Sequence, residues 1–365
     1  MSSFVEELDT PAVVIDLDRL DRNLRQTSDR AARAGVKLRP HIKTHKSIWI
    51  AKRQLALGAC GITVAKLGEA EVMAEAGIED ILIAYPILGA RKLARLAALI
   101  EKARVTVGVD SVEAAEGLSR LGLTLGTRIP LYLDVNSGLD RCGAEPGAPS
   151  AEIGLRLAEL AGVELVGLMT HAGHAYSRST VDGCREVAHA EAQALLATQE
   201  QLRAQGITVL EISVGSTPTS KFIGEVKGIT EMRPGAYVFG DGSQLYPGTI
   251  ALEECAMHIY ATVVSAPRPG TLILDAGSKT LTTDVSVHRP GYGYVPDHPD
   301  AVIERLSEEH AIMRVPDDCS LRIGDVVSII PNHCCTVVNL QDGLIGVRNG
   351  RFERELPVDA RGRIR

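Results

Sequence analysis

The sequence has few aromatic side chains and no excess of positive charge. Of its 365 residues only one is Trp and four are Phe, and the formal net charge is −7. Nucleic-acid interfaces need a basic surface and often aromatic side chains on which bases stack, so this composition argues against a nucleic-acid partner. The negative charge also argues against binding to an anionic membrane surface.

The chain also lacks long apolar runs and a cysteine pattern that predicts disulfide bonds. No stretch approaches the roughly 18 apolar residues that span a bilayer, and the acidic N-terminus has no apolar core of the kind that a signal peptide needs. The seven cysteines are odd in number and scattered, which is typical of reduced thiols. We therefore expect a soluble cytoplasmic protein with no membrane partner.

The first two-thirds of the chain alternate short apolar runs with helical patterns such as 17–34 and 180–205. The predicted strands lie at 12–16, 37–40, 61–65, 81–84, 105–109, 129–134, 165–170 and 210–214. Apolar strands that alternate with helices pair in parallel and are buried on both faces. Eight such units in about 220 residues predict a TIM-type (β/α)8 barrel, with a doubly wound sheet as the alternative.

The pattern changes after about residue 247, where short strands separated by Gly and Pro turns replace the helical segments. We therefore predict an α/β protein with two domains. The barrel would cover residues 10–245, and a mostly β domain would cover residues 246–365. Residues 1–9, which include Phe4 and Val5, are candidates to join the second domain.

A lysine follows the second predicted barrel strand, at the end of a barrel where active sites lie. It is Lys43, and its neighbours His41, His45 and Lys46 provide cationic surroundings. Such surroundings favour the neutral amine that a Schiff base requires. From spacing alone, a basic surface turn is the better explanation of these residues.

Two later strand ends carry further candidates for a binding site. The planar guanidinium of Arg141 could donate hydrogen bonds to an oxygen of a cofactor or substrate. An arginine that is simply exposed to solvent in a loop explains this position equally well. His171, His174 and Tyr176 cluster directly after the strand 165–170. Two histidines and a tyrosine at such a strand end favour a functional role over a plain connection.

A turn rich in glycine and hydroxyl groups follows the last predicted barrel strand. Gly215, Ser216 and Thr217 offer backbone N–H groups and hydroxyls to a phosphate, in the place where barrels commonly bind one. Gly235 and Tyr237 follow shortly after and could complete this pocket. By itself the turn is a weak motif.

The second domain contains a candidate metal site. In an extended segment alternate residues share a face, so His333 and Cys335 could point at one metal while Cys334 points away. Imidazole and thiolate suit Zn²⁺, and two protein ligands leave positions for water or substrate. Two ligands alone make a weak metal motif.

Taken in order, these motifs resemble the fold-type III, alanine racemase-like enzymes, which use pyridoxal 5'-phosphate. The specific resemblance is to the branch that contains D-serine dehydratase, D-threonine aldolase and the 3-hydroxy-D-aspartate lyases. It spans nearly the whole chain, through residues 9–11, 40–43, 141–143, 171–176, 215–219, 275–277 and 333–335. It implies a homodimer in which the partner's β domain completes the active site.

The resemblance also implies a role for each candidate residue. Lys43 corresponds to the Schiff-base lysine, and His333 and Cys335 correspond to the ligands of zinc or another divalent cation. The other candidates correspond to groups around the ring and phosphate of the cofactor: Arg141 near the phenolic oxygen, His171 beside the pyridine ring, Tyr176 at the ring nitrogen, and Gly215, Ser216, Thr217, Gly235 and Tyr237 at the phosphate.

The implied activity is that of a metal-assisted lyase acting on β-hydroxy-D-amino acids. The His-x-Cys pair resembles D-serine dehydratase and favours elimination to a 2-oxo acid and ammonia. Retro-aldol cleavage to glycine and an aldehyde, as in D-threonine aldolase, is the alternative, with His174 as a candidate base. A racemase, which needs no metal, and a non-catalytic cofactor-binding protein are further alternatives.

Overall fold

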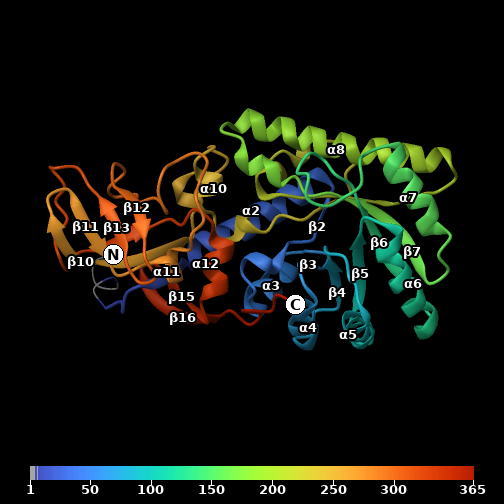
Figure 1. The fold of residues 1–365 in the computed structure, drawn as a ribbon, viewed down its shortest axis with the longest axis horizontal. Helices are drawn as coiled ribbons and strands as arrows, with labels where there is room; N and C mark the ends of the chain where they lie inside the picture. The colour runs from blue at the N-terminus through green and yellow to red at the C-terminus, as the bar shows by residue number, and fades with distance from the viewer. Residues whose placement is uncertain (1–4, 6) are drawn as a thin grey trace.

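The computed structural model describes residue 5 and residues 7–365, and it shows two domains side by side (Figure 1). One is a barrel of parallel strands surrounded by helices, and the other is a mostly β domain. Phe4, considered above as part of the second domain, lies outside the described residues. Within the described part of the chain, no helix has both the length and the apolar character needed to cross a membrane.

Eight parallel strands form the barrel, in the order β2–β9–β8–β7–β6–β5–β4–β3. They are β2 (Lys37–Leu38), β3 (Ile62–Val64), β4 (Asp80–Ile83), β5 (Arg104–Val109), β6 (Ile129–Asp134), β7 (Val163–Met169), β8 (Glu211–Val214) and β9 (Glu231–Met232). A parallel bridge between His41 and Thr63 joins the two ends of the series. The predicted (β/α)8 barrel is confirmed.

The helices around the barrel begin and end where the sequence provides caps. They are α2 (Leu17–Ala34), α3 (Ile48–Ala56), α4 (Leu67–Glu75), α5 (Ala90–Ile100), α6 (Val112–Leu125), α7 (Ala148–Ala158) and α8 (Val181–Ala204). The Asp16 side chain accepts hydrogen bonds from the backbone N–H groups of Asp18 and Arg19 in the first turn of α2, and Gly35 ends that helix with φ +66°. Thr180 caps α8 by accepting from Gly183 N.

The first predicted barrel strand belongs instead to the second domain. β1 (Ala12–Asp16) pairs with β10 (Met257–Arg268) and with β15 (Gly343–Arg348). The prediction that it opens the barrel is therefore wrong, and the strand missing from the predicted eight is β9. β1 was misassigned because an apolar run indicates burial but does not specify which sheet buries it. β9 was missed because a strand of two residues is too short to show an apolar pattern.

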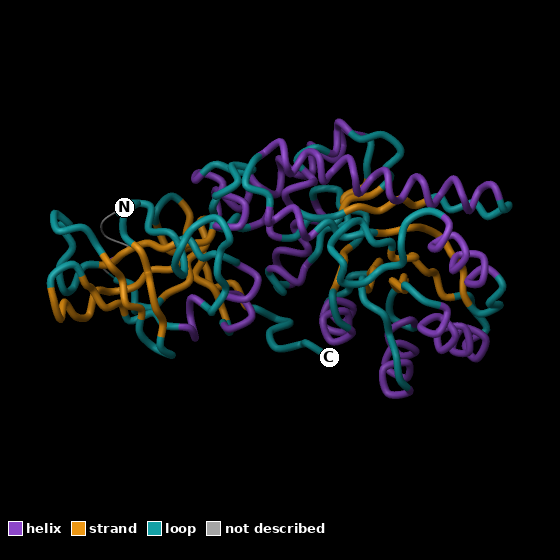
Figure 2. The backbone as a smooth tube through the Cα atoms, turned by 45° about the horizontal axis from the view of Figure 1, so that its top comes forward, coloured by secondary structure: helices purple, strands orange, loops and turns teal. Residues whose placement is uncertain are grey.

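The second domain is built on one branched sheet, whose remaining strands are β11 (Thr271–Leu274), β12 (Val302–Leu306), β13 (Ala311–Arg314), β14 (Val326–Ile329) and β16 (Arg351–Pro357). Its core continues into the barrel domain, because Leu20 of α2 and Phe239 pack with Ile259 of β10. After β16 the chain returns to the barrel (Figure 2), where Gly68 N donates to Arg365 O at 2.9 Å. Helix α12 (Cys334–Leu340) contacts the loop that carries Lys43.

Candidate active site

Lys43 lies at the carboxyl end of the barrel, in the 3-10 helix η1 (Ile42–Thr44) that follows β2. The loop is fixed by His41, whose N–H donates to Pro234 O at 3.0 Å. The Lys43 side chain lines an open cavity of about 510 Å³. Burial lowers the pKa of Lys43, the charges of Arg141 and Arg233 act in the same direction, and those of Cys335 and Glu69 oppose the shift. The amine therefore reaches its neutral, nucleophilic form more readily than an ordinary lysine.

Arg141 and His171 line the same small cavity. The positive charge of Arg141 lowers the pKa values of both His171 and Lys43. Burial is the main reason that the pKa of His171 falls to about 3, so its ring is neutral. The Nδ1–H of His171 donates to the carbonyl oxygen of Gly215, which leaves Nε2 as an acceptor.

Tyr176 and His174 share the 3-10 helix η2 (Gly173–Ser177) but have different surroundings. The Tyr176 hydroxyl accepts from Thr217 N at 3.4 Å, so it lies beside the predicted phosphate turn. The pKa of His174 is lowered by burial and by Arg178, against the charge of Asp140. The Nδ1 atom of His174 is buried and has no hydrogen-bond partner within the described residues.

The predicted phosphate turn contains a buried hydroxyl without a partner. Ser216 caps the short helix α9 (Thr217–Ser220) by accepting from Thr219 N at 3.3 Å. Thr217 Oγ1 is buried and has no hydrogen-bond partner within the described residues. Because an unpaired buried hydroxyl is costly, this atom fits a bound oxygen anion that accepts a hydrogen bond from it.

Glu191 of α8 lies beneath this turn, and sequence reasoning missed it. Gly215 N donates to Glu191 Oε2 at 3.4 Å. Burial raises the pKa of Glu191 to about 7, although hydrogen bonds from Thr219, Gly215 and Ala172 oppose the shift. One carboxyl group thus supports both the turn that carries Thr217 and the loop that carries His171.

Gly235 packs directly against the lysine loop. A Cβ atom at Gly235 would lie 2.8 Å from Thr44 Oγ1 and 2.9 Å from His41 O, so only glycine fits this close approach. The buried Tyr237 hydroxyl accepts from Gln54 Nε2 at 2.9 Å. Gln54 was not a sequence candidate, because nothing in its local pattern distinguishes it from other polar positions of α3.

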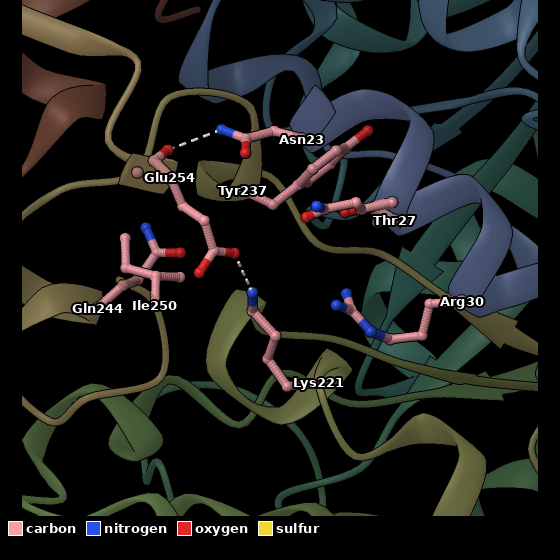
Figure 3. A pocket seen from close by; sticks show the side chains of 10 residues that line it. Asn23, Thr27, Arg30, Lys221, Tyr237, Gln244, Ile250 and Glu254 are labelled. Atoms are coloured by element: carbon pink, nitrogen blue, oxygen red, sulfur yellow. Dashed lines mark hydrogen bonds and ion pairs between the residues drawn. The ribbon is translucent and has the colours of Figure 1, made fainter. Parts of the chain in front are cut away.

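An enclosed polar pocket lies behind Tyr237 (Figure 3). In it Lys221 reaches toward Glu254, with Nζ and Oε1 2.8 Å apart, and Asn23 donates to the Glu254 carbonyl oxygen at 2.8 Å. Its volume of about 10 Å³ is close to that of one water molecule, so it is too small for a substrate.

His333 and Cys335 come together, but not on an extended segment. Cys334 begins helix α12 and His333 is its N-cap residue, so the predicted extended geometry is wrong. The cause is Asp241, whose Oδ2 accepts from Cys334 N at 2.9 Å and so starts the helix. The charge of Cys335 raises the pKa of His333 to about 11 against the effect of burial, which shows how close the two groups lie.

Asp241 also orients the imidazole, since its Oδ2 lies 3.5 Å from His333 Nδ1. A histidine that binds a metal through one ring nitrogen usually donates from the other to a carboxylate, so this donor set fits a metal. No cluster of three or more His, Cys, Asp or Glu side chains suited to a metal occurs among residue 5 and residues 7–365. Asp241 lies too far from residue 333 in the sequence for spacing to reveal the pair.

The candidate metal pair lies next to the lysine loop of the same chain. Cys335 Sγ is 3.2 Å from Thr44 Oγ1, and Cys335 and Lys43 line the same cavity. The β domain of one chain therefore reaches the mouth of its own barrel.

Residues 15–243 match the family model described as the alanine racemase N-terminal domain. The chain belongs to this family. A second model, described as a putative serine dehydratase domain, matches residues 256–347. The resemblance to alanine racemase-like enzymes inferred from the motifs is thus confirmed.

Named relatives of this alanine racemase-like chain catalyse more than one reaction. The chain is 34% identical to D-threonine aldolase of an Arthrobacter species over 97% of its length and 93% of the relative's. It is 35% identical to D-threo-3-hydroxyaspartate dehydratase of a Delftia species, covering 90% and 91% of the two chains. A metal-free cysteine-to-alanine mutant of that dehydratase has also been solved; it has a TM-score of 0.89 and 32% identity, with 97% of this chain and 98% of that one covered.

The crystal structure of D-threonine aldolase from Filomicrobium marinum is similar in fold across the whole chain. The TM-score is 0.91 at 34% identity, and the match covers 99% of this chain and 98% of that one. The alanine racemase-like fold therefore extends over both domains.

Proposed function

We propose that this chain is a pyridoxal phosphate-dependent, metal-assisted lyase of β-hydroxy-D-amino acids. The observation that carries the proposal is the contact of Cys335 with Thr44, which brings an imidazole–thiolate pair to the cavity of a lysine with a lowered pKa. The named relatives are lyases of this substrate class, which supports the same conclusion.

Lys43 is the residue proposed to hold the cofactor, through its amine. The unpartnered Thr217 Oγ1, Ser216, and the backbone near Gly215 and Gly235 would hold the phosphate. When bound, pyridoxal phosphate supplies an electron sink for negative charge at the substrate Cα. We assign Lys43 as the base that takes the Cα proton, because burial favours its neutral amine.

Around the cofactor ring, we propose the predicted roles for Arg141 and His171. The contact of the Tyr176 hydroxyl with Thr217 N supports a place beside the phosphate instead of the predicted one at the ring nitrogen. Arg141 offers its donors to an oxygen, while the neutral His171 ring is oriented by Gly215 O. Tyr237 would complete the phosphate pocket, with its hydroxyl oriented by Gln54.

His333 and Cys335 are the proposed ligands of a divalent ion, and Asp241 orients the imidazole. Thiolate and imidazole together favour Zn²⁺. Such an ion supplies a Lewis acid for the β-hydroxyl group. The existence of a metal-free form of the related dehydratase is consistent with a metal in this family.

We favour elimination to a 2-oxo acid and ammonia. The His-x-Cys pair, which resembles that of D-serine dehydratase, favours this outcome, and His174 stays the candidate base of the alternative cleavage. Retro-aldol cleavage to glycine and an aldehyde is the second candidate, supported by the similarity to D-threonine aldolase. We further propose a cytoplasmic homodimer.

The deciding experiment incubates the zinc-loaded holoenzyme with D-serine and with D-threonine. The 2-oxo acid and ammonia are measured against glycine and acetaldehyde, with an EDTA-treated sample in parallel. We expect 2-oxo acid, and loss of activity with EDTA. Racemisation that survives EDTA would show a racemase instead, and lack of turnover on every β-hydroxy-D-amino acid would overturn the proposal.

A further inference from the structure

The cavity beside Lys43 contains more positive charge than the cofactor chemistry requires. Besides Lys43, the lysines Lys46 and Lys66 line it, with Glu69 as the carboxylate on the same wall. Two of these three lysines have an evident role. Lys43 is the proposed cofactor lysine, and Lys46 forms a buried ion pair with Glu69, in which Nζ and Oε1 are 2.6 Å apart.

Lys66 is the lysine of this cavity whose charge neither the proposed cofactor chemistry nor an ion pair explains. It stands at the N-terminus of α4, and its Nζ lies 3.5 Å from the centre of the Tyr85 ring. Glu69 does not neutralise it, since that carboxylate is committed to Lys46 and to the backbone of Ala65. No carboxylate in the described part of the chain forms an ion pair with Lys66. A positioned ammonium without a counter-ion on a cavity wall is suited to binding an anionic ligand group.

The position of Lys66 indicates which group of the substrate it meets. Arg141 and His171, which are proposed to lie around the cofactor ring, line a separate small cavity whose lining does not include Lys66. Cys335, the proposed metal ligand for the β-hydroxyl group, lines the same cavity as Lys66. Atoms beyond the β-carbon of a substrate therefore extend into the cavity that Lys66 faces.

We propose that Lys66 is a specificity-determining residue that binds the distal carboxylate of a dicarboxylic β-hydroxy-D-amino acid. The inference rests on the proposed lyase function and names its substrate class. A substrate with a neutral side chain leaves Lys66 without an ion pair, whereas a β-carboxylate forms one with it at the wall of the cavity. The preferred substrates are therefore of the 3-hydroxy-D-aspartate type.

The test compares the zinc-loaded holoenzyme with Lys66→Met and Lys66→Arg on both diastereomers of 3-hydroxy-D-aspartate and on D-threonine. We expect Lys66→Met to lower kcat/KM for the better 3-hydroxy-D-aspartate diastereomer about tenfold or more, mainly through KM. Its kcat/KM for D-threonine should stay within about twofold of wild type, and Lys66→Arg should keep most of the activity on the dicarboxylate. Lys52→Met, an exposed lysine of α3, is the matched control.

Equal losses on both substrates would overturn the inference, because Lys66 would then act on a group common to both or on the fold. An unchanged kcat/KM for 3-hydroxy-D-aspartate would overturn it as well, and so would a wild-type enzyme that cleaves D-threonine but not the dicarboxylate. A wild-type enzyme that cleaves none of these compounds would instead defeat the proposed function.

Discussion

At the scale of single residues, burial and a few hydrogen bonds and charges shift the pKa values of the groups in this site. Burial lowers the pKa of Lys43 and is the largest influence on it. His171 is held neutral for the same reason. Cys335, in contrast, has a lowered pKa because Cys334 donates a hydrogen bond to it and because His333 carries positive charge, which outweighs burial. The cavity therefore places an amine with a lowered pKa beside a thiol with a lowered pKa.

Replacing Lys43 tests the cofactor assignment. Lys43→Ala should abolish the visible absorbance of the lysine-bound cofactor and lower kcat by about 10²-fold or more, since it removes both the attachment point and the proposed base. Absorbance spectra and steady-state kinetics measure the two effects. Lys52→Ala should match wild type, and a fully active Lys43→Ala enzyme would disprove the assignment.

Replacing Cys335 tests the metal assignment separately. Cys335→Ala should lower bound zinc and activity, by about tenfold or more, while the visible cofactor absorbance stays intact. Metal content is measured on the purified protein by elemental analysis. Cys319→Ala, another thiol of the β domain, is the control, and equal zinc content in the two variants would refute the role of Cys335.

At the scale of elements, helix α8 connects two parts of the site through Glu191. Its carboxyl group accepts from Gly215 N and lies under both the phosphate turn and the loop that follows β7. Burial raises the pKa of Glu191 from its ordinary value of 4.5 to about 7. The protonated form therefore stabilises the fold more than the ionised form does.

This pKa predicts a pH dependence of stability. A group with a raised folded-state pKa contributes stability below its unfolded value of 4.5, and that contribution is lost as pH rises through about 7. Compared with Glu191→Gln, the wild-type free energy of unfolding should fall by about 3 kcal/mol over this range. Urea unfolding of both proteins across pH measures the difference. The exposed Glu186→Gln on the same helix should show no such divergence, and parallel curves for Glu191→Gln would contradict the prediction.

At the scale of the whole molecule, the β domain of one chain reaches its own barrel. Cys335 contacts Thr44 at 3.2 Å, and a shared core with Leu20 and Phe239 holds the two domains together. The lysine and the proposed metal ligands are therefore supplied by the same chain. In the proposed homodimer the partner can complete the cavity, but it does not need to provide this pair.

A complementation experiment tests this arrangement. Light scattering should first show a mass of twice 39.0 kDa. Lys43→Ala and Cys335→Ala subunits are then unfolded, mixed and refolded together. Because each mixed dimer lacks an intact pair on either chain, activity should stay at the level of the single variants. Recovery of about a quarter of the wild-type activity would show that the pair is shared between chains.

Local patterns predicted most elements but not their partners. The bounds of α2 followed from its cap at Asp16, its apolar spacing and Gly35. The assignment of β1 failed, because its apolar run is buried equally well in either sheet. Residues 333–335 were predicted to be extended, since the carboxylate of Asp241 that begins helix α12 comes from a distant segment. Glu191 and Gln54 escaped notice for the same reason.

The sequence by itself determined the order of the motifs, the alternation that builds a barrel, and the kinds of groups available to the chemistry. These depend on near neighbours along the chain, where periodicity and capping act. Tertiary structure alone decided that Cys335 lies at the cavity of Lys43, that Asp241 orients His333, and that Lys66 has no counter-ion within residue 5 and residues 7–365. Such contacts join residues far apart in the chain, and they arise only when the two domains pack on their shared core.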